Sequence, residues 1–215
     1  MPTADTVRVD FALIPDDALF GAVITASQAI TSAFRDNANV VDAEVFPPHV
    51  SLLICTIPRA ALAAVTVDLE ALAAAGLPDI TAITVEPSTS GYVMLTIKRT
   101  PGLMVLHEAI LGVAARARAD LGGDPFGSRY VGAAFAPHIS LAKIDADDQA
   151  NAASVGLRTL GPSRIAGARA LDLCDIGERS DRWDILASFP AARYPSANGP
   201  GRGAQLLPCV IRPDS

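Results

Sequence analysis

Two stretches of the chain, "VFPPHVSLLI" at residues 45–54 and "AFAPHISLAKI" at residues 134–144, share one pattern. In each, phenylalanine is followed by any residue, proline, histidine, valine or isoleucine, serine and leucine. The chain has only three histidines, and two of them, His49 and His138, occupy this pattern 89 residues apart. A motif that returns at this distance, with room for several strands and helices between the copies, indicates an internal duplication.

The residues around the motifs support a duplication, because the same order of elements is predicted twice. Alternation and β-branched residues predict strands, whereas prolines, acidic residues and glycines mark helix ends. The first series is a strand at 7–14, a helix at 16–34, a strand at 49–57, a helix at 59–76 and a strand at 80–87. The second series is a strand at 91–99, a helix at 102–123, a strand at 138–144, a weaker helix at 147–159, and strands at 168–176 and 182–189.

This order predicts the α+β fold class, as a duplicated bilobal fold with two pseudo-symmetric halves. Each half, approximately residues 5–90 and 91–190, is expected to contain an antiparallel sheet and two helices. A pseudo-twofold relation would bring the two histidines together across a central cleft. We therefore expect one domain at 1–190, followed by a Pro/Gly-rich extension at 191–215.

Composition limits the class of protein. Half of the 215 residues are hydrophobic, which is enough for a sizeable core. The net charge of −6 argues against a protein that holds long duplex nucleic acid through many phosphates. The three cysteines are scattered, and neither a signal peptide nor an apolar run long enough to cross a bilayer is visible. We expect a cytoplasmic monomer that does not associate with membranes.

The two motifs have the residues needed for acid–base chemistry. Because side chains two apart in a strand share a face, His49 and Ser51 are expected on one side, and His138 and Ser140 likewise. A neutral imidazole accepts a proton from an attacking group, and a protonated one donates to a leaving oxygen. Serine hydroxyls donate to phosphate oxygens. The sequence does not decide which histidine is the acid and which the base.

The motifs "HVSL" at 49–52 and "HISL" at 138–141 resemble those of the 2H phosphoesterase superfamily, over about residues 5–190. The likeness is strongest to its 2′-5′ RNA ligase and cyclic phosphodiesterase group. The resemblance implies a metal-free, cofactor-free enzyme that opens 2′,3′-cyclic phosphates on nucleotides or short RNA ends. Some members also join or cleave 2′-5′ linkages.

The resemblance also implies roles for single residues. His49 and His138 would be the catalytic pair, and Ser51 and Ser140 would bind the substrate phosphate. Lys143 stands five positions after the second histidine, where many members carry arginine, and would bind phosphate without the two-pronged arginine geometry. This chain also has serine in both motifs where many members have threonine.

Other residues are weaker candidates. Tyr92 and Trp183, at two predicted strand starts, would either stack on a base or serve packing. Arg129 and Tyr130, in the loop before the second motif, would contribute to a substrate lid. His107 is interpreted as a surface or helix-packing residue.

Two other functions stay open at this point. The first is a non-catalytic module that binds nucleotides or RNA ends in the same cleft. The second is a metal site built on the two histidines. This function is disfavoured, because metal sites usually need three or four protein ligands and the motifs have no acidic or cysteine neighbour in sequence that would complete such a site.

Overall fold

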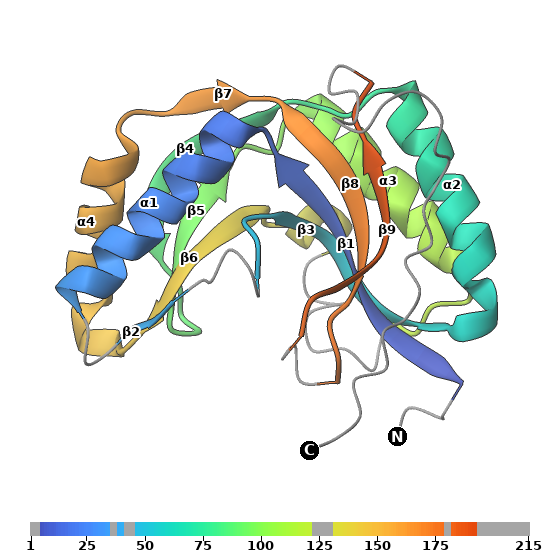
Figure 1. The fold of residues 1–215 in the computed structure, drawn as a ribbon, viewed down its shortest axis with the longest axis horizontal. Helices are drawn as coiled ribbons and strands as arrows, with labels where there is room; N and C mark the ends of the chain where they lie inside the picture. Colours follow the sequence, from blue (N-terminus) through green and yellow to red (C-terminus); the bar gives the residue numbers. More distant parts are fainter. Residues whose placement is uncertain (1–4, 35–37, 41–45, 122–130, 179–181, 193–215) are drawn as a thin grey trace.

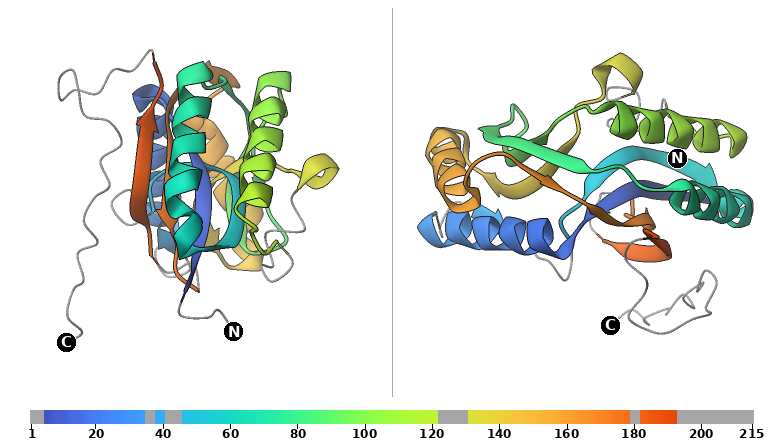
Figure 2. Two further views of the ribbon diagram at one scale, coloured as in Figure 1. Left: turned by 90° about the vertical axis from the view of Figure 1, so that its right-hand side faces the viewer. Right: turned by 90° about the horizontal axis from the view of Figure 1, so that it is seen from above.

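Two antiparallel sheets stand next to each other and form an arch, with helices on their outer sides (Figures 1 and 2). The computed structural model describes residues 5–34, 38–40, 46–121, 131–178 and 182–192. Sheet A has the strand order β3 (Val50–Pro58), β1 (Thr6–Pro15), β8 (Ala168–Asp175) and β9 (Asp184–Pro190). Sheet B has the order β2 (Ala38–Val40), β6 (His138–Ile144), β5 (Tyr92–Ile97), β4 (Ile80–Pro87) and β7 (Arg164–Ala166).

Each sheet is covered by two helices. Sheet A packs against α2 (Leu62–Ala75) and α3 (Pro101–Arg116), and sheet B packs against α1 (Asp17–Ala33) and α4 (Gln149–Leu160). Three short 3₁₀ turns complete the described elements: η1 (Arg59–Ala61), η3 (Gly132–Ala134) and η4 (Ala146–Asp148). The predicted α+β bilobal class is confirmed.

The ends of the two long helices follow from their sequences. The Asp16 side chain accepts a hydrogen bond from the Leu19 N–H at 2.9 Å and caps α1. Thr100 caps α3 in the same way, by accepting from the Leu103 N–H, and Pro101 occupies the first turn. The sequence signals that delimit these helices are therefore physical contacts in the structure.

The two lobes do not coincide with the two halves of the sequence. Sheet A takes β1 and β3 from the first half and β8 and β9 from the second, and sheet B also mixes the halves. The pseudo-symmetry is nevertheless clear, because the order β3-β1-β8-β9 corresponds to β6-β5-β4-β7. Helix α1 follows β1 of sheet A but covers sheet B, and helix α3 follows β5 of sheet B but covers sheet A (Figure 1).

Three local features differ from the prediction. Helix α3 ends at Arg116 instead of continuing to residue 123, because Asp120 pairs with Thr56 through two backbone hydrogen bonds. The short edge strands β2 and β7 were not predicted, since three residues are too few for a periodic signal. Residues 193–215 of the predicted extension lie outside the described residues.

Both histidine strands contain a β-bulge at the same place in the motif. On β3, Ser51 is paired with Ala12 and Leu53 with Phe11, so that Leu52 has no partner on β1. On β6, Ser140 is paired with Met94 and Ala142 with Val93, and Leu141 is the extra residue. A bulge leaves the extra residue unpaired and reverses the alternation beyond it.

A buried side chain satisfies the carbonyl of each bulged leucine. Ser27 of α1 donates its hydroxyl to the Leu141 carbonyl at 2.6 Å. His107 of α3 donates from Nδ1 to the Leu52 carbonyl at 2.9 Å. Both side chains are fully buried, and these hydrogen bonds explain why polar groups occupy the core.

His107 also contacts the residues that precede the second motif. Its Nε2 accepts a hydrogen bond from the Gly132 N–H at 3.1 Å, and its ring stacks on Phe135 with centroids 3.9 Å apart. The helix-packing interpretation of His107 is thus confirmed, and the surface interpretation is wrong. Burial lowers the pKa of His107, against the hydrogen bond to Leu52, which suits an imidazole whose Nε2 must remain an acceptor.

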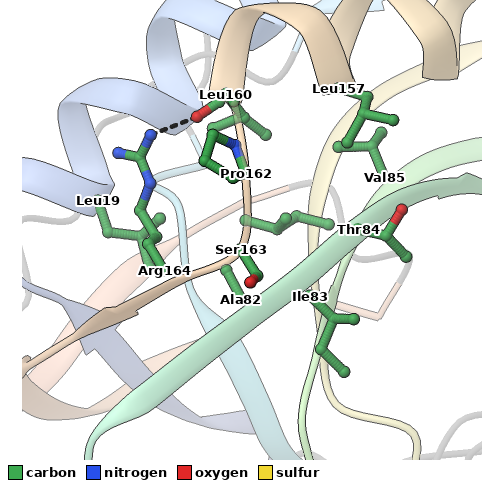
Figure 3. A pocket seen from close by; sticks show the side chains of 12 residues that line it. Leu19, Ala82, Ile83, Thr84, Val85, Leu157, Leu160, Pro162, Ser163 and Arg164 are labelled. Atoms are coloured by element: carbon green, nitrogen blue, oxygen red, sulfur yellow. Dashed lines mark hydrogen bonds between the residues drawn. The ribbon is translucent and has the colours of Figure 1, made fainter.

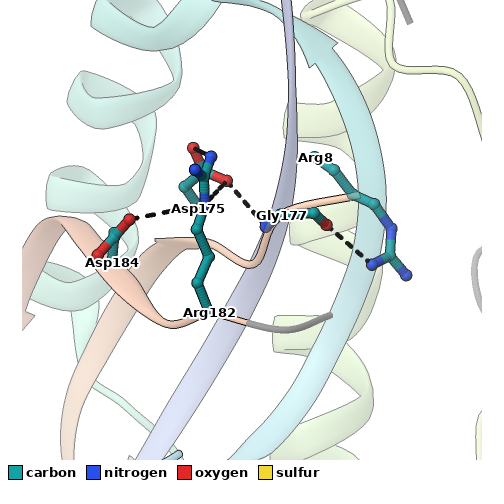
Figure 4. A network of polar contacts seen from close by, with 5 residues as sticks. All are labelled: Arg8, Asp175, Gly177, Arg182 and Asp184. Carbon is teal, nitrogen blue, oxygen red and sulfur yellow. Dashed lines mark hydrogen bonds and ion pairs between the residues drawn. The ribbon is translucent and has the colours of Figure 1, made fainter. Parts of the chain in front are cut away.

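A polar network closes the end of sheet A where β8 leads to β9 (Figure 4). The buried Asp175 carboxylate accepts from the Gly177 N–H at 3.0 Å and pairs with Arg182. Arg182 also lies 3.6 Å from Asp184, and Arg8 donates to the Gly177 carbonyl at 3.2 Å. The network ties β1 to the segment that leads into Trp183 and β9.

Among the described residues, no helix is both long and apolar enough to cross a membrane.

Candidate active site

Strands β3 and β6, which carry the two motifs, are in contact in the middle of the arch (Figure 1). On β1, Val9, Phe11 and Leu13 point into the main core. Asp10 and Ala12 alternate with them and lie on the opposite face of sheet A. Residues paired across antiparallel strands share a face, so Ser51 and Asp172, both paired with Ala12, belong to this opposite face.

The two histidines have the same orientation relative to their strands. The Nδ1 of His49 donates to the Pro47 carbonyl at 2.7 Å, and the Nδ1 of His138 donates to the Ala136 carbonyl at 2.9 Å. These contacts assign the neutral tautomer with the proton on Nδ1, which leaves Nε2 of each ring available for chemistry. The charge of His49 contributes to the lowered pKa of His138, so the two rings are within electrostatic reach of each other.

A buried aspartate that the motifs do not contain lies beside the first histidine. The Ser51 hydroxyl donates to Asp10 Oδ2 at 2.6 Å, and the same oxygen lies 3.5 Å from His49 Nε2. The Asp10 side chain is only 2% exposed, and its Oδ1 has no hydrogen-bond partner among the described residues. A buried carboxylate with a single donor is costly unless a positive charge stands near it.

A second buried carboxylate, Asp172 of β8, lies on the same face. Ser188 donates its hydroxyl to Asp172 at 2.6 Å. Burial raises the pKa of Asp172 to about 6, against the lowering effects of Ser188, Arg169 and His49. Asp172 is therefore largely ionised at neutral pH and adds to the negative potential around His49.

The pKa values of the two histidines move in opposite directions. Burial acts to lower the pKa of His49, but the Asp10 carboxylate 3.5 Å from Nε2, the Pro47 carbonyl and the charge of Asp172 outweigh it, and the pKa is raised. Burial lowers the pKa of His138, and the hydrogen bond to Ala136 and the charge of Asp10 do not compensate. Near neutral pH, His49 therefore holds a proton more readily than His138 does.

The second motif presents its polar groups differently from the first. The Ser140 hydroxyl has no hydrogen-bond partner among the described residues, whereas Ser51 is engaged by Asp10. On β6, Lys143 is paired with Tyr92 of β5, and Ser140 is paired with Met94. Tyr92 and Met94 are two residues apart and share a face of β5, so the bulge at Leu141 places Lys143 on the same face as Ser140. The exposed Lys143 ammonium lies 5.7 Å from the centre of the Tyr92 ring.

The remaining predicted site residues lie in different surroundings or outside the described part of the chain. Trp183 lies against His49, with ring centroids 4.2 Å apart and ring planes tilted by 36°, and it contacts Phe46 edge-on. It also covers the small apolar cluster of Ala12, Ile14 and Ala170, and its buried indole N–H has no partner among the described residues. Tyr92 lies on β5, next to β6. Arg129 and Tyr130 lie outside the described residues.

Sequence reasoning missed Asp10 and Asp172. A signal was present, because each is a carboxylate with apolar residues on both sides inside a predicted strand, in "VRVDFALI" and "ARALDLCDI". Their relation to His49 depends on strand pairing between residues far apart in sequence, which the local pattern does not specify.

A small pocket elsewhere on the molecule is separate from these residues. It lies between α1, the end of α4 and β4, and Leu19, Val85, Leu157 and Leu160 are among its mostly apolar lining residues (Figure 3). None of the predicted site residues lines it.

In the described parts of the chain, no group of three or more His, Cys, Asp or Glu side chains is placed to hold a metal ion.

Comparison with known families gives the class of the protein. Residues 15–164 match the sequence model of the 2′-5′ RNA ligase superfamily, which is more than half of the chain. The chain therefore belongs to this superfamily, the 2H phosphoesterases. No curated protein matches the chain in sequence.

Solved structures agree with this fold. The protein TT0787 of Thermus thermophilus matches with a TM-score of 0.57 and 17% identity, over 85% of this chain and 97% of that one. The E. coli LigT structure with 3′-AMP matches with a TM-score of 0.52 and 17% identity, over 87% and 99%. Apo LigT matches with a TM-score of 0.53 and 15% identity, again over 87% and 99%. At these identities the likeness shows the fold alone.

Proposed function

We propose that the protein hydrolyses 2′,3′-cyclic phosphates of nucleotides or short RNA ends by two-histidine acid–base catalysis, without a metal ion or cofactor. The observation that carries this proposal is the pair of Nδ1-anchored imidazoles, each with Nε2 available, on two touching strands. One ring takes a proton from water and the other gives a proton to the leaving ribose oxygen. The same geometry would serve cleavage or joining of 2′-5′ linkages, because the protons move along the same path in reverse.

The polar groups around the histidines suit one phosphate. The Ser140 hydroxyl, which no described residue engages, would donate to a non-bridging oxygen, and Lys143 supplies a positive charge on the same face. The Ser51 hydroxyl proton is donated to Asp10, so in this arrangement Ser51 does not donate to the phosphate and can only accept a hydrogen bond from a hydroxyl of the substrate. Trp183 and Tyr92 offer flat faces for a nucleobase.

The expected substrate is small. LigT, which shares the fold, has been crystallised with 3′-AMP and with phosphate. The net charge of −6 and the single lysine at the site favour a mononucleotide or a short end over long duplex nucleic acid. We propose that the protein acts as a monomer.

Incubation of the purified protein with EDTA and each 2′,3′-cyclic nucleotide tests the proposal directly. We expect a ring-opened monophosphate, and we expect His49→Ala and His138→Ala each to lower the rate by about 10²–10⁴-fold. Thr25→Ala is a matched control, since among the described residues this exposed hydroxyl bonds to its own helix alone, at Gly21. A 2′-5′-linked dinucleotide should be assayed in parallel.

Two outcomes would contradict the proposal. Activity that disappears on chelation would exclude the metal-free mechanism. Binding of nucleotides without turnover of any cyclic or 2′-5′ substrate would favour the alternative of a non-catalytic nucleotide or RNA-end binding module.

A further inference from the structure

The duplication allows the two half-sites to be compared position by position. The bulges place Ile54 opposite Asp10 in the first copy and Lys143 opposite Tyr92 in the second. Asp10 and Tyr92 therefore occupy equivalent positions on β1 and β5. The strand position that holds a carboxylate in the first copy therefore holds a phenol in the second.

We infer that Asp10 is a positioning residue that breaks the twofold symmetry of the site and commits His49 to the acid role and His138 to the base role. The inference rests on the proposed function and makes it more specific. Asp10 transfers no proton in this scheme; it acts through the imidazole of His49.

The geometry explains how Asp10 acts. Its Oδ2 lies 3.5 Å from His49 Nε2, which is close enough for strong attraction and longer than a usual hydrogen bond. The Nε2 proton is therefore stabilised but not locked, and it remains available to a leaving oxygen. Ser51 fixes the carboxylate by donating to the same oxygen, so the ion pair is held in place.

The other ionisable groups around the rings favour the same assignment. His49 faces Asp10 on β1, Asp172 on β8 and His138 on β6. The buried Cys174, whose pKa is raised mainly by burial, lies opposite Asp10 on β8 and stays neutral. His138 faces His49 and, more weakly, Asp10, and the described residues include no carboxylate within ion-pair distance of it. Lys143 on its own strand adds positive charge to that side.

In ring opening, each proton transfer is then assigned to one histidine. His138 Nε2 takes a proton from water as the water oxygen forms a bond to phosphorus. The bond from phosphorus to one ribose oxygen breaks, and His49 Nε2 gives its proton to that oxygen. The products are a phosphomonoester and a free hydroxyl, and the two histidines return to their starting states by proton exchange with solvent.

The single tryptophan of the chain allows His49 to be observed without any substrate. The Trp183 and His49 ring centroids lie 4.2 Å apart, and a protonated imidazole in contact with indole quenches its fluorescence. A fluorescence titration of the wild-type protein should therefore show a transition at the pKa of His49. We expect its midpoint above 6.5, the ordinary value for histidine, and we expect His49→Gln to abolish the transition.

Two variants test the role of Asp10. Asp10→Asn keeps an acceptor for Ser51 and removes the charge, and it should lower the midpoint by about 1–3 pH units. Tyr92→Asp places a carboxylate at the equivalent position of the second copy, and it should raise the pKa of His138 in an NMR titration. A wild-type midpoint below 6.5, or an unchanged midpoint in Asp10→Asn, would overturn the inference.

Kinetics with a p-nitrophenyl phosphodiester test the roles themselves. This leaving group needs no proton, so His49→Ala should lose less than about tenfold on it while losing about 10²–10⁴-fold on a cyclic phosphate. His138→Ala should be impaired on both substrates, and selective rescue of His138→Ala instead would overturn the assignment. Because the fluorescence test needs no turnover, an inactive protein would contradict the proposed function and leave the inference about Asp10 separately testable.

Discussion

At the scale of single residues, a few buried polar side chains carry most of the argument. Asp10, Ser27, His107, Asp172 and Asp175 are buried, and each has a partner that explains it. Ser27 and His107 bind bulge carbonyls, Asp175 belongs to the arginine network, and Asp10 and Asp172 surround His49.

Asp172→Asn is expected to stabilise the protein at pH 8 and to have little effect near pH 4. Burial raises the pKa of Asp172 in the folded state to about 6, above its unfolded value of 3.8, so the folded state binds more protons between these values. The folded protein consequently loses stability as pH rises through 6. A shift of this size corresponds to roughly 3 kcal/mol, which the neutral amide would recover.

Urea unfolding of Asp172→Asn at the two pH values measures this difference. Asp184→Asn is the matched control, because Asp184 lies on the neighbouring strand and is 68% exposed. An equal gain in both variants, or a gain for Asp172→Asn that does not change with pH, would contradict the electrostatic explanation.

At the scale of elements, the bulges in β3 and β6 organise the site. Without a bulge, the fifth residue after His138 would point to the core face, since five is odd and side chains alternate. The extra residue Leu141 reverses the alternation, so Lys143 shares a face with Ser140. The same irregularity in β3 brings Asp10 opposite Ile54 and next to His49.

Ser27→Ala should lower the free energy of unfolding by about 1–3 kcal/mol, because the Leu141 carbonyl would lose its buried donor. Chemical denaturation measures the loss. Thr31→Ala on the same helix is the control, since the Thr31 hydroxyl donates only to helix carbonyls, and it should change stability by less than about 0.5 kcal/mol. A Ser27→Ala variant as stable as Thr31→Ala would show that the bulge does not depend on this contact.

The regular elements could be predicted from the sequence, and the irregular ones could not. Strand alternation and the helix-start signals at Asp16 and Pro101 are local, and the elements they delimit are present. A bulge inside "SLLI" or "SLAKI" has no local signal, because two consecutive apolar residues are equally compatible with a regular buried strand. The end of α3 depends on Thr56, which lies far earlier in the chain.

The same limit applies to the candidate site. His49, Ser51, His138 and Ser140 were found because their motif is repeated. Asp10 was not found because it belongs to a different strand and has no counterpart in the second copy. A search of a duplicated sequence for matching residues finds the symmetric part of a site and overlooks the residue that makes it asymmetric.

At the scale of the whole molecule, the two repeats are interleaved. Sheet A has two strands from each half, and sheet B combines β2 and β4 with β5, β6 and β7 (Figure 1). Neither half can therefore complete a sheet or bury the face of one. The pseudo-symmetric unit in space is a lobe built from both repeats.

Separate fragments 1–89 and 90–215 should each fail to fold, and mixing them should restore the native circular dichroism and NMR spectra. The cut falls in the exposed turn between β4 and β5, so the backbone break itself disturbs little. A full chain with a protease site inserted there, cleaved only after folding, is the control and should remain assembled. Cooperative unfolding of fragment 1–89 alone would contradict this prediction.

The central place of β1 in sheet A has a consequence for synthesis on the ribosome. One edge of β1 pairs with β3, but the other pairs with β8, which begins at Ala168, roughly 110 residues after β3 ends. At about 5–20 residues per second, that edge waits several seconds as an unpaired, apolar strand. A nascent chain of this kind is exposed to strand pairing with its neighbours on a polysome, and translation speed through residues 59–167 becomes a determinant of yield.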